Sequence, residues 1–337
     1  MRKKIVFAAA VISAFAAFSA GTADAQKILK HGSFAPGLSP YTVNTAWATM
    51  ANKYVDGVEV QIIATGAATR HQLLGVQNKM DFFMMAPITY WLLYNQKGPF
   101  KKIKNGPELI KNHCGVFSYE LGPYHFTTYA ADGMRKLEDI KGKKVFIGPP
   151  GGSATRTVGQ MIKQHSGLVA GTDFEQAKLG WGAALQAFQD RKIDVLVVPT
   201  NFPSPGIQQI ALTNKLYFLS LEKDKIPTLP IAKQIGRTVV EIPADAYGDN
   251  QINTETVHTF GATVGLGTRC SMDDDTIYKI TKAFWEHLDE VHAMAPWAKN
   301  TLTLERSLHM IPEPIHPGAM RYYNEIGAKT SEFKLKK

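Results

Sequence analysis

Apolar and polar positions along the chain predict short strands that alternate with amphipathic helices. From residue 28, a short apolar strand leads through a Gly/Pro-rich turn into a helix whose apolar residues recur every three or four positions. An alternating strand over 58–63, a second turn, a further helix and the apolar run 82–85 follow. This strand–helix–strand order predicts a parallel sheet with crossover helices.

The same order restarts in the middle of the chain. Here we expect, in turn, a strand, a glycine turn, a helix, a short strand, a helix and a buried strand, at 144–147, 148–152, 153–165, 178–179, 183–190 and 193–198. Two extended segments, 125–130 and 259–268, are expected to connect the two units and to act as a hinge. A long amphipathic helix over 273–293 and a last helix after Pro317 are expected in the tail.

These elements predict an α/β protein with two lobes, each a mainly parallel sheet with flanking helices, joined by crossover strands. We expect lobe 1 to comprise 27–128 plus 262–337, and lobe 2 to comprise 129–261. A chain of 337 residues suits two domains. Hydrophobic residues at 45% and charged residues at 20% are typical of a globular protein rather than of a disordered one.

The first 25 residues are typical of a secretory signal. Arg2, Lys3 and Lys4 precede an uncharged apolar stretch, and Ala23-Asp24-Ala25 fits a small-x-small cleavage site. The alternative is an uncleaved membrane anchor, for which the stretch is short. The segment therefore predicts a cleaved signal peptide and a periplasmic protein.

Charge and cysteine content narrow the partners. The formal net charge is +9, but the lysines are scattered, and no basic stripe with interleaved aromatic residues indicates nucleic-acid binding. An attraction for small anions is compatible with this charge. Cys114 and Cys270 lie too far apart in sequence for a CxxC motif or a thiolate-rich zinc site. They are either a disulfide or two buried free cysteines.

A glycine turn in the middle of the chain is the first candidate for chemistry. The turn 148–152 follows a strand and opens a helix at Ser153, so that backbone N–H groups can face an anion. Ser153 and Thr155 add hydroxyl donors. The Gly-Lys-Ser/Thr ending of a nucleotide P-loop does not occur. The alternative is an ordinary turn with Ser153 as the helix N-cap.

Arg70 is the second candidate. It follows the turn 65–69 at an expected strand-to-helix junction, and a guanidinium can hold a carboxylate through two parallel hydrogen bonds. The alternative is a solvated arginine on a helix. Phe34 and Tyr41 are candidates for the wall of a cleft, and the sequence does not decide between Trp91 and Trp181 as a further wall residue.

Enzyme motifs do not occur in the sequence: GxSxG, HExxH, GxGxxG and the EF-hand spacing are all missing. We therefore expect a protein that is not an enzyme, with no catalytic residues and no cofactor. Asp289 and His292 stand three apart on the expected tail helix, a spacing that a metal can use. A solvated helix face explains one such pair equally well, and we expect no metal site.

Three segments, Gly148–Thr155, Asp190–Val195 with Asn201-Phe202-Pro203, and His316–Tyr323, resemble the TAXI-type solute receptors of TRAP (tripartite ATP-independent periplasmic) transporters. The resemblance implies a two-lobed periplasmic binding protein fold of the second type. It also implies a small organic anion as ligand and an integral-membrane permease as partner. By position, the ligand contacts that it implies are Ser33, Phe34, Tyr41, Ala67, Ala68, Thr69, Arg70, Pro87, Gly151, Gly152, Ser153, Ala154, Thr155, Asn201 and Pro203.

The sequence departs from the family pattern at positions expected to line the ligand. The turns Ser33–Gly37 and Gly66–Ala68 are less polar than usual, and Ala86-Pro87-Ile88 replaces a Gln-Ser-Asp stretch. We therefore expect a carboxylate joined to a larger or more apolar body, rather than a glutamate-like ligand. Two alternatives stay open: a binding module that feeds a membrane signalling receptor, and an enzyme on the same scaffold.

Overall fold

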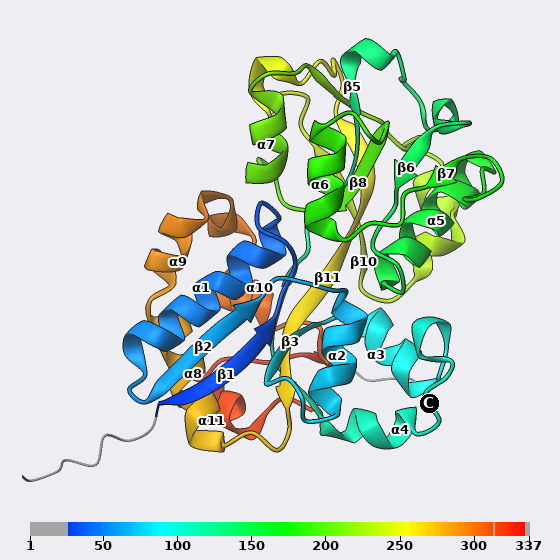
Figure 1. Cartoon of the computed structure of the whole chain (residues 1–337). Helices are drawn as coiled ribbons and strands as arrows, with labels where there is room; N and C mark the ends of the chain where they lie inside the picture. The colour runs from blue at the N-terminus through cyan, green and yellow to red at the C-terminus, as the bar shows by residue number, and fades with distance from the viewer. Residues whose placement is uncertain (1–25, 313, 334–337) are drawn as a thin grey trace, which may run out of the picture.

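Two α/β lobes lie one above the other in the structure, a computed structural model that describes residues 26–312 and 314–333 (Figure 1). The expected signal peptide, 1–25, lies outside the described residues. Across the described ranges, no helix combines the length and the apolar character needed to cross a membrane.

Lobe 1 begins with the predicted parallel strands. β1 (Lys27–Gly32) pairs in parallel with both β2 (Val58–Ile63) and β3 (Phe82–Met85), and the connections are α1 (Ser39–Tyr54) and α2 (Ala68–Val76). The sheet order is β10-β11-β3-β1-β2, with β4 also paired to β11. Every residue of β3 is buried, as expected of a central strand covered on both faces.

The core of lobe 1 is an aromatic cluster around Trp47 of α1. Its indole lies 5.9 Å from Phe82, 5.5 Å from Phe117 and 5.3 Å from Phe284, measured between ring centroids. These rings come from α1, the sheet and α8, so the cluster joins one helix layer to the sheet. Separated aromatic pairs at such distances add to the stabilisation from buried apolar area.

Lobe 2 repeats the order around a second mixed sheet. Its strands are β5 (Tyr124–Tyr129), β6 (Lys144–Phe146), β7 (Glu175–Gln176), β8 (Val195–Pro199) and β9 (Leu216–Phe218), in the order β7-β6-β8-β5-β9. The helices are α5 (Ser153–Ser166), α6 (Trp181–Gln189) and α7 (Pro205–Ala211). The short strand expected at 178–179 lies earlier in the sequence, at β7. The Ala177 N–H, directly after β7, donates to Val145 O and is the last hydrogen bond between β7 and β6.

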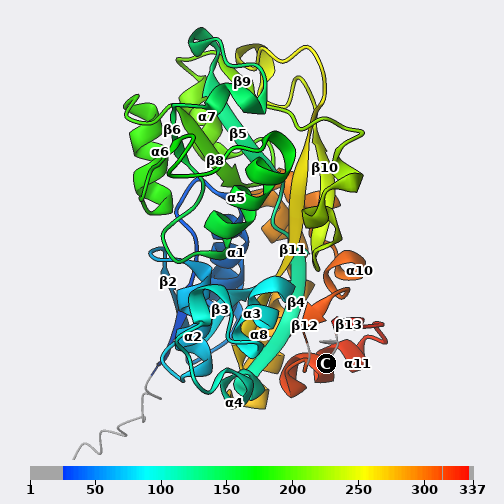
Figure 2. The same ribbon diagram turned by 90° about the vertical axis from the view of Figure 1, so that its right-hand side faces the viewer.

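One long strand passes between the lobes (Figures 1 and 2). β11 (Val257–Arg269) pairs with β10 (Arg237–Ile242) through Ala262, and from Thr263 onward with β4 (His113–Glu120). The expected lobe boundary at 128/129 falls at the end of β5, which pairs with β8 and β9. The chain therefore crosses before Tyr124, between β4 and β5.

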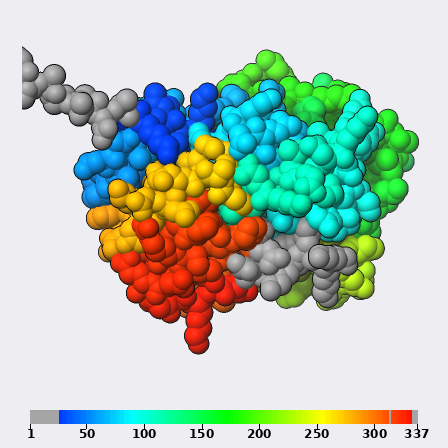
Figure 3. Space-filling view, turned by 90° about the horizontal axis from the view of Figure 1, so that it is seen from below, coloured from blue at the N-terminus to red at the C-terminus, as the bar shows by residue number. Residues whose placement is uncertain are grey.

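The remaining elements complete lobe 1. They are α3 (Pro87–Tyr94), α4 (Gly106–Leu109), α8 (Asp274–Glu286), α9 (Leu288–Met294), α10 (Leu304–Ser307), β12 (Ile311–Pro312), α11 (Pro317–Glu325) and β13 (Glu332–Phe333). N-terminal and C-terminal segments share one surface of this lobe (Figure 3).

The prediction of a single long helix over 273–293 is wrong. α8 ends at Glu286 and α9 starts at Leu288, because His287 leaves helical geometry, with φ −113° and ψ 33°. The His287 ring stacks on Tyr54 of α1, with centroids 3.5 Å apart and an interplanar angle of 4°. A tertiary contact therefore coincides with the break, and no local Pro or Gly marks it.

Cys114 and Cys270 form a disulfide, which decides between the two alternatives that the sequence left open. The bond joins β4 to the residue that follows β11, so both ends lie in lobe 1. The closed loop spans a sequence separation of 156 and contains the whole of lobe 2.

Three histidines are fully buried and neutral. Burial lowers the pKa of His31 and of His113 to about 3, and the pKa of His125 to about 4. Within the described residues, neither ring nitrogen of His31 or His113 has a hydrogen-bond partner. The His125 ring is held between Pro123 O and the Tyr247 hydroxyl, at 3.0 and 2.9 Å.

Removal of the disulfide should lower stability through the unfolded chain. We expect the double substitution Cys114→Ala and Cys270→Ala to reduce the free energy of unfolding by about 4 kcal/mol, because it releases a long closed loop. Urea unfolding followed by circular dichroism measures this. Unfolding of the unaltered protein under reducing conditions should show a similar loss, and an unchanged midpoint in both experiments would contradict the prediction.

Acid should destabilise the protein from pH 6.5 downward. Below that pH these three histidines bind protons in the unfolded chain, whereas buried His31, His113 and His125 stay neutral in the folded chain. The free energy of unfolding is therefore at its full value above pH 6.5 and decreases as the pH falls. With each histidine contributing at most about 1.4 kcal/mol per pH unit, we expect a slope of roughly 4 kcal/mol per unit near pH 5. Urea unfolding at pH 8, 6 and 5 measures it. His113→Gln should remove about a third of the slope; a slope equal to that of the unaltered protein would count against burial as the cause.

Candidate ligand-binding site

A small cavity lies where the two lobes face each other. Its volume is about 30 Å³, enough for about two water molecules. Lobe 1 and the adjoining chain crossing contribute mostly apolar residues to its wall, namely Phe34, Ala68, Met84, Ala86, Ile88, Thr89 and Leu121. Lobe 2 contributes Tyr124, Ser153, Ala154, Thr157 and Pro199, and the paired strands β10 and β11 contribute Arg237, Ala262 and Val264.

Three helices begin at this cavity. α2, α3 and α5 each follow a parallel strand, and residues at the start of each helix line the cavity: Ala68, Ala86 and Ser153. The N-cap residues are Ala67, Ala86 and Gly152, and within the described ranges none of their own side chains makes a capping bond, although at the start of α3 the Ala86 N–H donates to Thr89 Oγ1. Helix starts without such caps keep backbone N–H donors available and carry a partial positive charge.

Arg237 brings a full positive charge to the same cavity. It is the first residue of β10, and its Nη1 donates to Gly261 O at 3.0 Å, while its Nη2 donates to Thr157 Oγ1 at 3.4 Å. Its Nε is buried and has no hydrogen-bond partner among the described residues. A buried donor without an acceptor is costly, so the guanidinium is oriented by the protein but not satisfied by it.

The electrostatic balance of the cavity is positive. Over the described chain, no aspartate or glutamate lines the cavity to offset Arg237 and the helix starts. The rest of the wall is mostly hydrocarbon, from side chains such as Phe34, Met84 and Ile88. The arrangement therefore suits a small anion with an apolar portion.

Contacts between the lobes close the cavity on two sides. Phe34 of lobe 1 stacks on Trp181 of lobe 2, with ring centroids 4.8 Å apart. On another side, Thr69 Oγ1 at the start of α2 donates to Gly151 O before α5, at 2.9 Å. Both contacts join residues of different lobes, so they form only when the lobes are together.

A second set of contacts joins the lobes near the chain crossings. Ser204 Oγ and Gly206 N both donate to Gly37 O, at 2.8 and 3.1 Å. Ser39 N donates to Thr200 Oγ1 at 3.0 Å. A Cβ added to Gly37 would lie 3.1 Å from Gly206 Cα, and the φ of Gly37 is +90°, so this approach requires glycine.

The residues predicted from sequence fall into two groups near the cavity. Phe34, Ala68, Ser153 and Ala154 line it. The others in its vicinity, which make or flank contacts between the lobes, are Ala67, Thr69, Pro87, Gly151 and Gly152. Pro87 lies against the segment beside Arg237, since a Cβ added to Gly236 would meet its ring at 3.2 Å.

The prediction that Arg70 contacts a ligand stays a prediction. Its side chain is exposed on α2, and it is not among the lining residues, because the helix carries it past the turn and onto the solvent face. Arg237 is the arginine of the cavity. Neither tryptophan is among the lining residues of the cavity: Trp181 stacks on Phe34, which does line it, whereas Trp91 lies near the surface under Lys97.

Five other predicted residues lie outside the cavity wall. Ser33 Oγ accepts from Asn44 inside lobe 1, and Thr155 Oγ1 donates to Pro149 O of its own turn. Asn201 bonds Ser39 and faces a separate cavity behind the crossing strands. Tyr41 is half-buried on α1 and Pro203 is exposed.

Sequence reasoning missed Arg237, Thr157, Tyr124 and the apolar lobe 1 wall. Arg237 opens the segment Arg-Thr-Val-Val-Glu-Ile, whose β-branched residues indicate a strand. A lone arginine between a glycine and such a run is a usable signal. Its position at the cavity depends, however, on pairing with the distant β11.

A larger groove lies on lobe 2 alone, beside the edge strand β7. Its volume is about 960 Å³, and its wall carries charges of both signs, including Lys144, Asp173 and Glu175. Lys144 and Glu175 pair with each other at 2.7 Å. The groove has no contribution from lobe 1 in the described structure, and its charges compensate one another, so we favour the cavity between the lobes.

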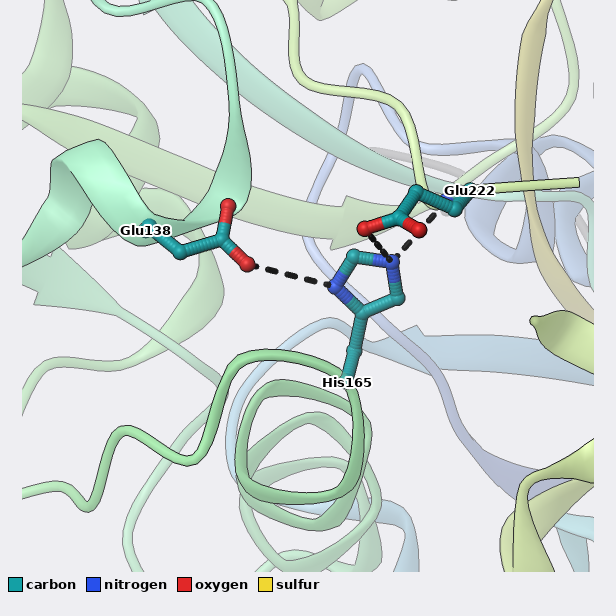
Figure 4. Close-up of side chains that lie close together, drawn as sticks. All are labelled: Glu138, His165 and Glu222. Carbon is teal, nitrogen blue, oxygen red and sulfur yellow. Dashed lines mark hydrogen bonds and ion pairs between the residues drawn. The ribbon is translucent and has the colours of Figure 1, made fainter.

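Glu138, His165 and Glu222 form the cluster most like a metal site among the described residues (Figure 4). The carboxylates approach opposite ring nitrogens, with Glu138 4.0 Å from Nδ1 and Glu222 3.9 Å from Nε2. Glu222 N–H donates to Nε2 at 2.9 Å, so the proton of the neutral ring is on Nδ1 and no lone pair points at a shared centre. The cluster joins three segments of lobe 2.

The Asp289 and His292 pair does not converge on a site. Asp289 is exposed, and His292 Nε2 lies 2.9 Å from Leu302 O, which uses that nitrogen in a hydrogen bond. The solvated face expected for this helix therefore applies to Asp289.

Solved structures similar to this chain come from several transport systems. One is a TRAP periplasmic solute-binding protein from Sulfitobacter sp. NAS-14.1 with bound β-D-galacturonate, at 11% identity and a TM-score of 0.46, with 91% of this chain and 89% of that chain covered. Another, from Ralstonia eutropha H16 with bound (S)-2-acetolactate, has 12% identity, a TM-score of 0.46 and coverage of 91% and 87%. The alkanesulfonate-binding protein SsuA from Xanthomonas axonopodis pv. citri, bound to MOPS, has 11% identity, a TM-score of 0.45 and coverage of 88% and 83%.

At these identities and TM-scores, nothing about the ligand of this chain follows from the solved structures. The comparison with protein families does assign a family. A family model described as the NMT1-like family matches residues 37–327, which is most of the chain, and the protein therefore belongs to the NMT1-like family.

Proposed function

We propose that this protein is an extracytoplasmic solute-binding protein that closes its two lobes on a small organic anion and delivers it to a TRAP permease in the membrane. The observation that carries the proposal is the buried Nε of Arg237, a donor with no acceptor in the described structure, in a cavity shared by both lobes. An anionic oxygen is the partner that satisfies such a donor best.

The surroundings of Arg237 support the same ligand. The starts of α2, α3 and α5 add partial positive charge, and no acidic side chain within the described lining set opposes it. The export and the permease partner rest on the sequence alone: the signal-like segment 1–25 and the resemblance of Gly148–Thr155 and His316–Tyr323 to TRAP solute receptors.

Capture and release follow from the contacts between the lobes. The cavity holds about 30 Å³ when the lobes touch, so an organic anion must enter while they are apart. β11 runs between the lobes, pairing first with β10 and then with β4, and the chain crosses again between β4 and β5, so these segments are the natural hinge. A micromolar ligand needs about −8 kcal/mol, which one charge-assisted pair with several backbone donors and apolar burial can supply.

A panel of organic anions tests the proposal. We measure thermal unfolding in the presence of acetate, butyrate, succinate, galacturonate or methanesulfonate, with butylamine as a cationic control. At least one anion should raise the melting temperature, and the amine should leave it unchanged. Calorimetry then gives the affinity, and chemical analysis of the recovered anion shows whether it is unchanged. No shift with any anion would refute anion capture, and conversion of the anion would favour an enzyme.

Arg237→Gln should weaken binding of every anion that the panel identifies. We expect a loss of at least about tenfold, the scale of one hydrogen bond to a charged group, measured by calorimetry. Arg70→Gln is the matched control, because Arg70 is exposed and outside the cavity wall. Its affinity should stay within about twofold of the unaltered protein. If instead only the Arg70→Gln variant lost affinity for the anion, the binding site would lie at the start of α2.

Thr69→Val should weaken binding without changing selectivity. The substitution keeps the shape of the side chain but removes the hydrogen bond from Thr69 Oγ1 to Gly151 O, which exists only between closed lobes. We expect all bound anions to lose affinity by about the same five- to tenfold factor, the scale of one neutral hydrogen bond. Calorimetry across the panel measures this, and a loss confined to one anion would indicate a direct ligand contact instead.

A further inference from the structure

The two lobes contribute different chemistry to the cavity wall. The polar side chains Tyr124, Ser153 and Thr157 come from lobe 2, and Arg237 comes from β10 and donates to Thr157. Lobe 1 and the crossing segments contribute mostly hydrocarbon, represented by Phe34, Met84 and Leu121. A ligand between them therefore meets a polar side and an apolar side.

Thr89 is the one polar side chain that lobe 1 adds to the described lining set, and its hydroxyl is already engaged. Its Oγ1 donates to Ala86 O at 2.9 Å and accepts from Ala86 N at 3.1 Å. A hydroxyl has a single proton to donate. Thr89 therefore has no donor left for a group on the ligand.

The polar side has the opposite character. Arg237 keeps its Nε unpaired, and Ser153 at the start of α5 lies with it in the wall. Thr157 Oγ1 accepts from Arg237 Nη2, and Gly261 O accepts from Nη1, so the guanidinium is held from behind. The anionic head of a ligand belongs at this pole, and its remaining atoms must then face lobe 1.

We infer that the ligand is a carboxylate whose body is unhydroxylated hydrocarbon, rather than a sugar acid or another polyhydroxylated acid. The inference rests on the proposed function, whose site it specifies further. A hydroxyl directed at Phe34, Met84 and Leu121 would lose its water without gaining a side-chain partner, which is unfavourable.

Four-carbon acids with increasing hydroxyl content test this inference at constant chain length. Calorimetry should show butyrate bound most tightly, 3-hydroxybutyrate about tenfold more weakly and threonate, with three hydroxyls, at least about a hundredfold more weakly. Hexanoate and galactonate repeat the comparison for six carbons. Threonate or galactonate bound as tightly as its unhydroxylated counterpart would overturn the inference while leaving anion capture intact. If none of these acids or the panel anions binds, the proposed function itself fails.

Met84→Gln provides a second, independent arm. The side chain keeps nearly the same shape but places an amide among the apolar wall residues. We expect the preference for butyrate over 3-hydroxybutyrate to shrink at least about threefold, because the amide can pair with the added hydroxyl. Met84→Leu is the apolar control and should keep the preference. If the glutamine variant does not fold, Leu121→Asn serves the same purpose, and an unchanged preference in a folded variant contradicts the assignment of lobe 1 as the selective wall.

Discussion

The half-buried guanidinium of Arg237, with its buried Nε, is the constraint around which the proposed site is arranged. Thr157 and Gly261 hold two of its nitrogens, while the third has no acceptor in the described chain. Removing a guanidinium from water without completing its hydrogen bonds is unfavourable, and the fold offers no carboxylate nearby in the described lining to compensate. The protein thus carries a local cost that the proposed anion between the lobes would relieve.

The fold explains why that charge lies between the lobes. Arg237 starts β10, which pairs with the first half of β11, while the second half of β11 belongs to the sheet of lobe 1. The parallel strands β2, β3 and β6 each end at a helix start that faces the same space. Ligand sites of open α/β sheets commonly lie beyond the carboxyl ends of the strands. The long strand β11 and the helix starts that follow β2, β3 and β6 therefore all place residues at the cavity between the lobes.

Local patterns predicted much of this, and the limits have a physical cause. The periodicity of 28–85 and 144–198 predicted the parallel cores, and the helix starts at Ala68 and Ser153 were expected beside the ligand, because strand, turn and helix are neighbours in sequence. Arg237 was missed because its place depends on a pairing with Ala262, which no local pattern reports. The exposed position of Arg70 depends on the same kind of information: sequence indicates the junction, but not which side of the helix faces the other lobe. The break at His287 depends on Tyr54, far away in the chain.

The disulfide covalently links the two chain segments that flank lobe 2 in the sequence. Cys114 and Cys270 both lie in lobe 1, and every strand of the second sheet falls between them in sequence. Lobe 2 is therefore an insertion whose two connections are tied together at their base. A protease that cuts once in an exposed loop of this insertion would produce two fragments that stay linked through lobe 1. Such a nicked chain would migrate as one species until the disulfide between Cys114 and Cys270 was reduced.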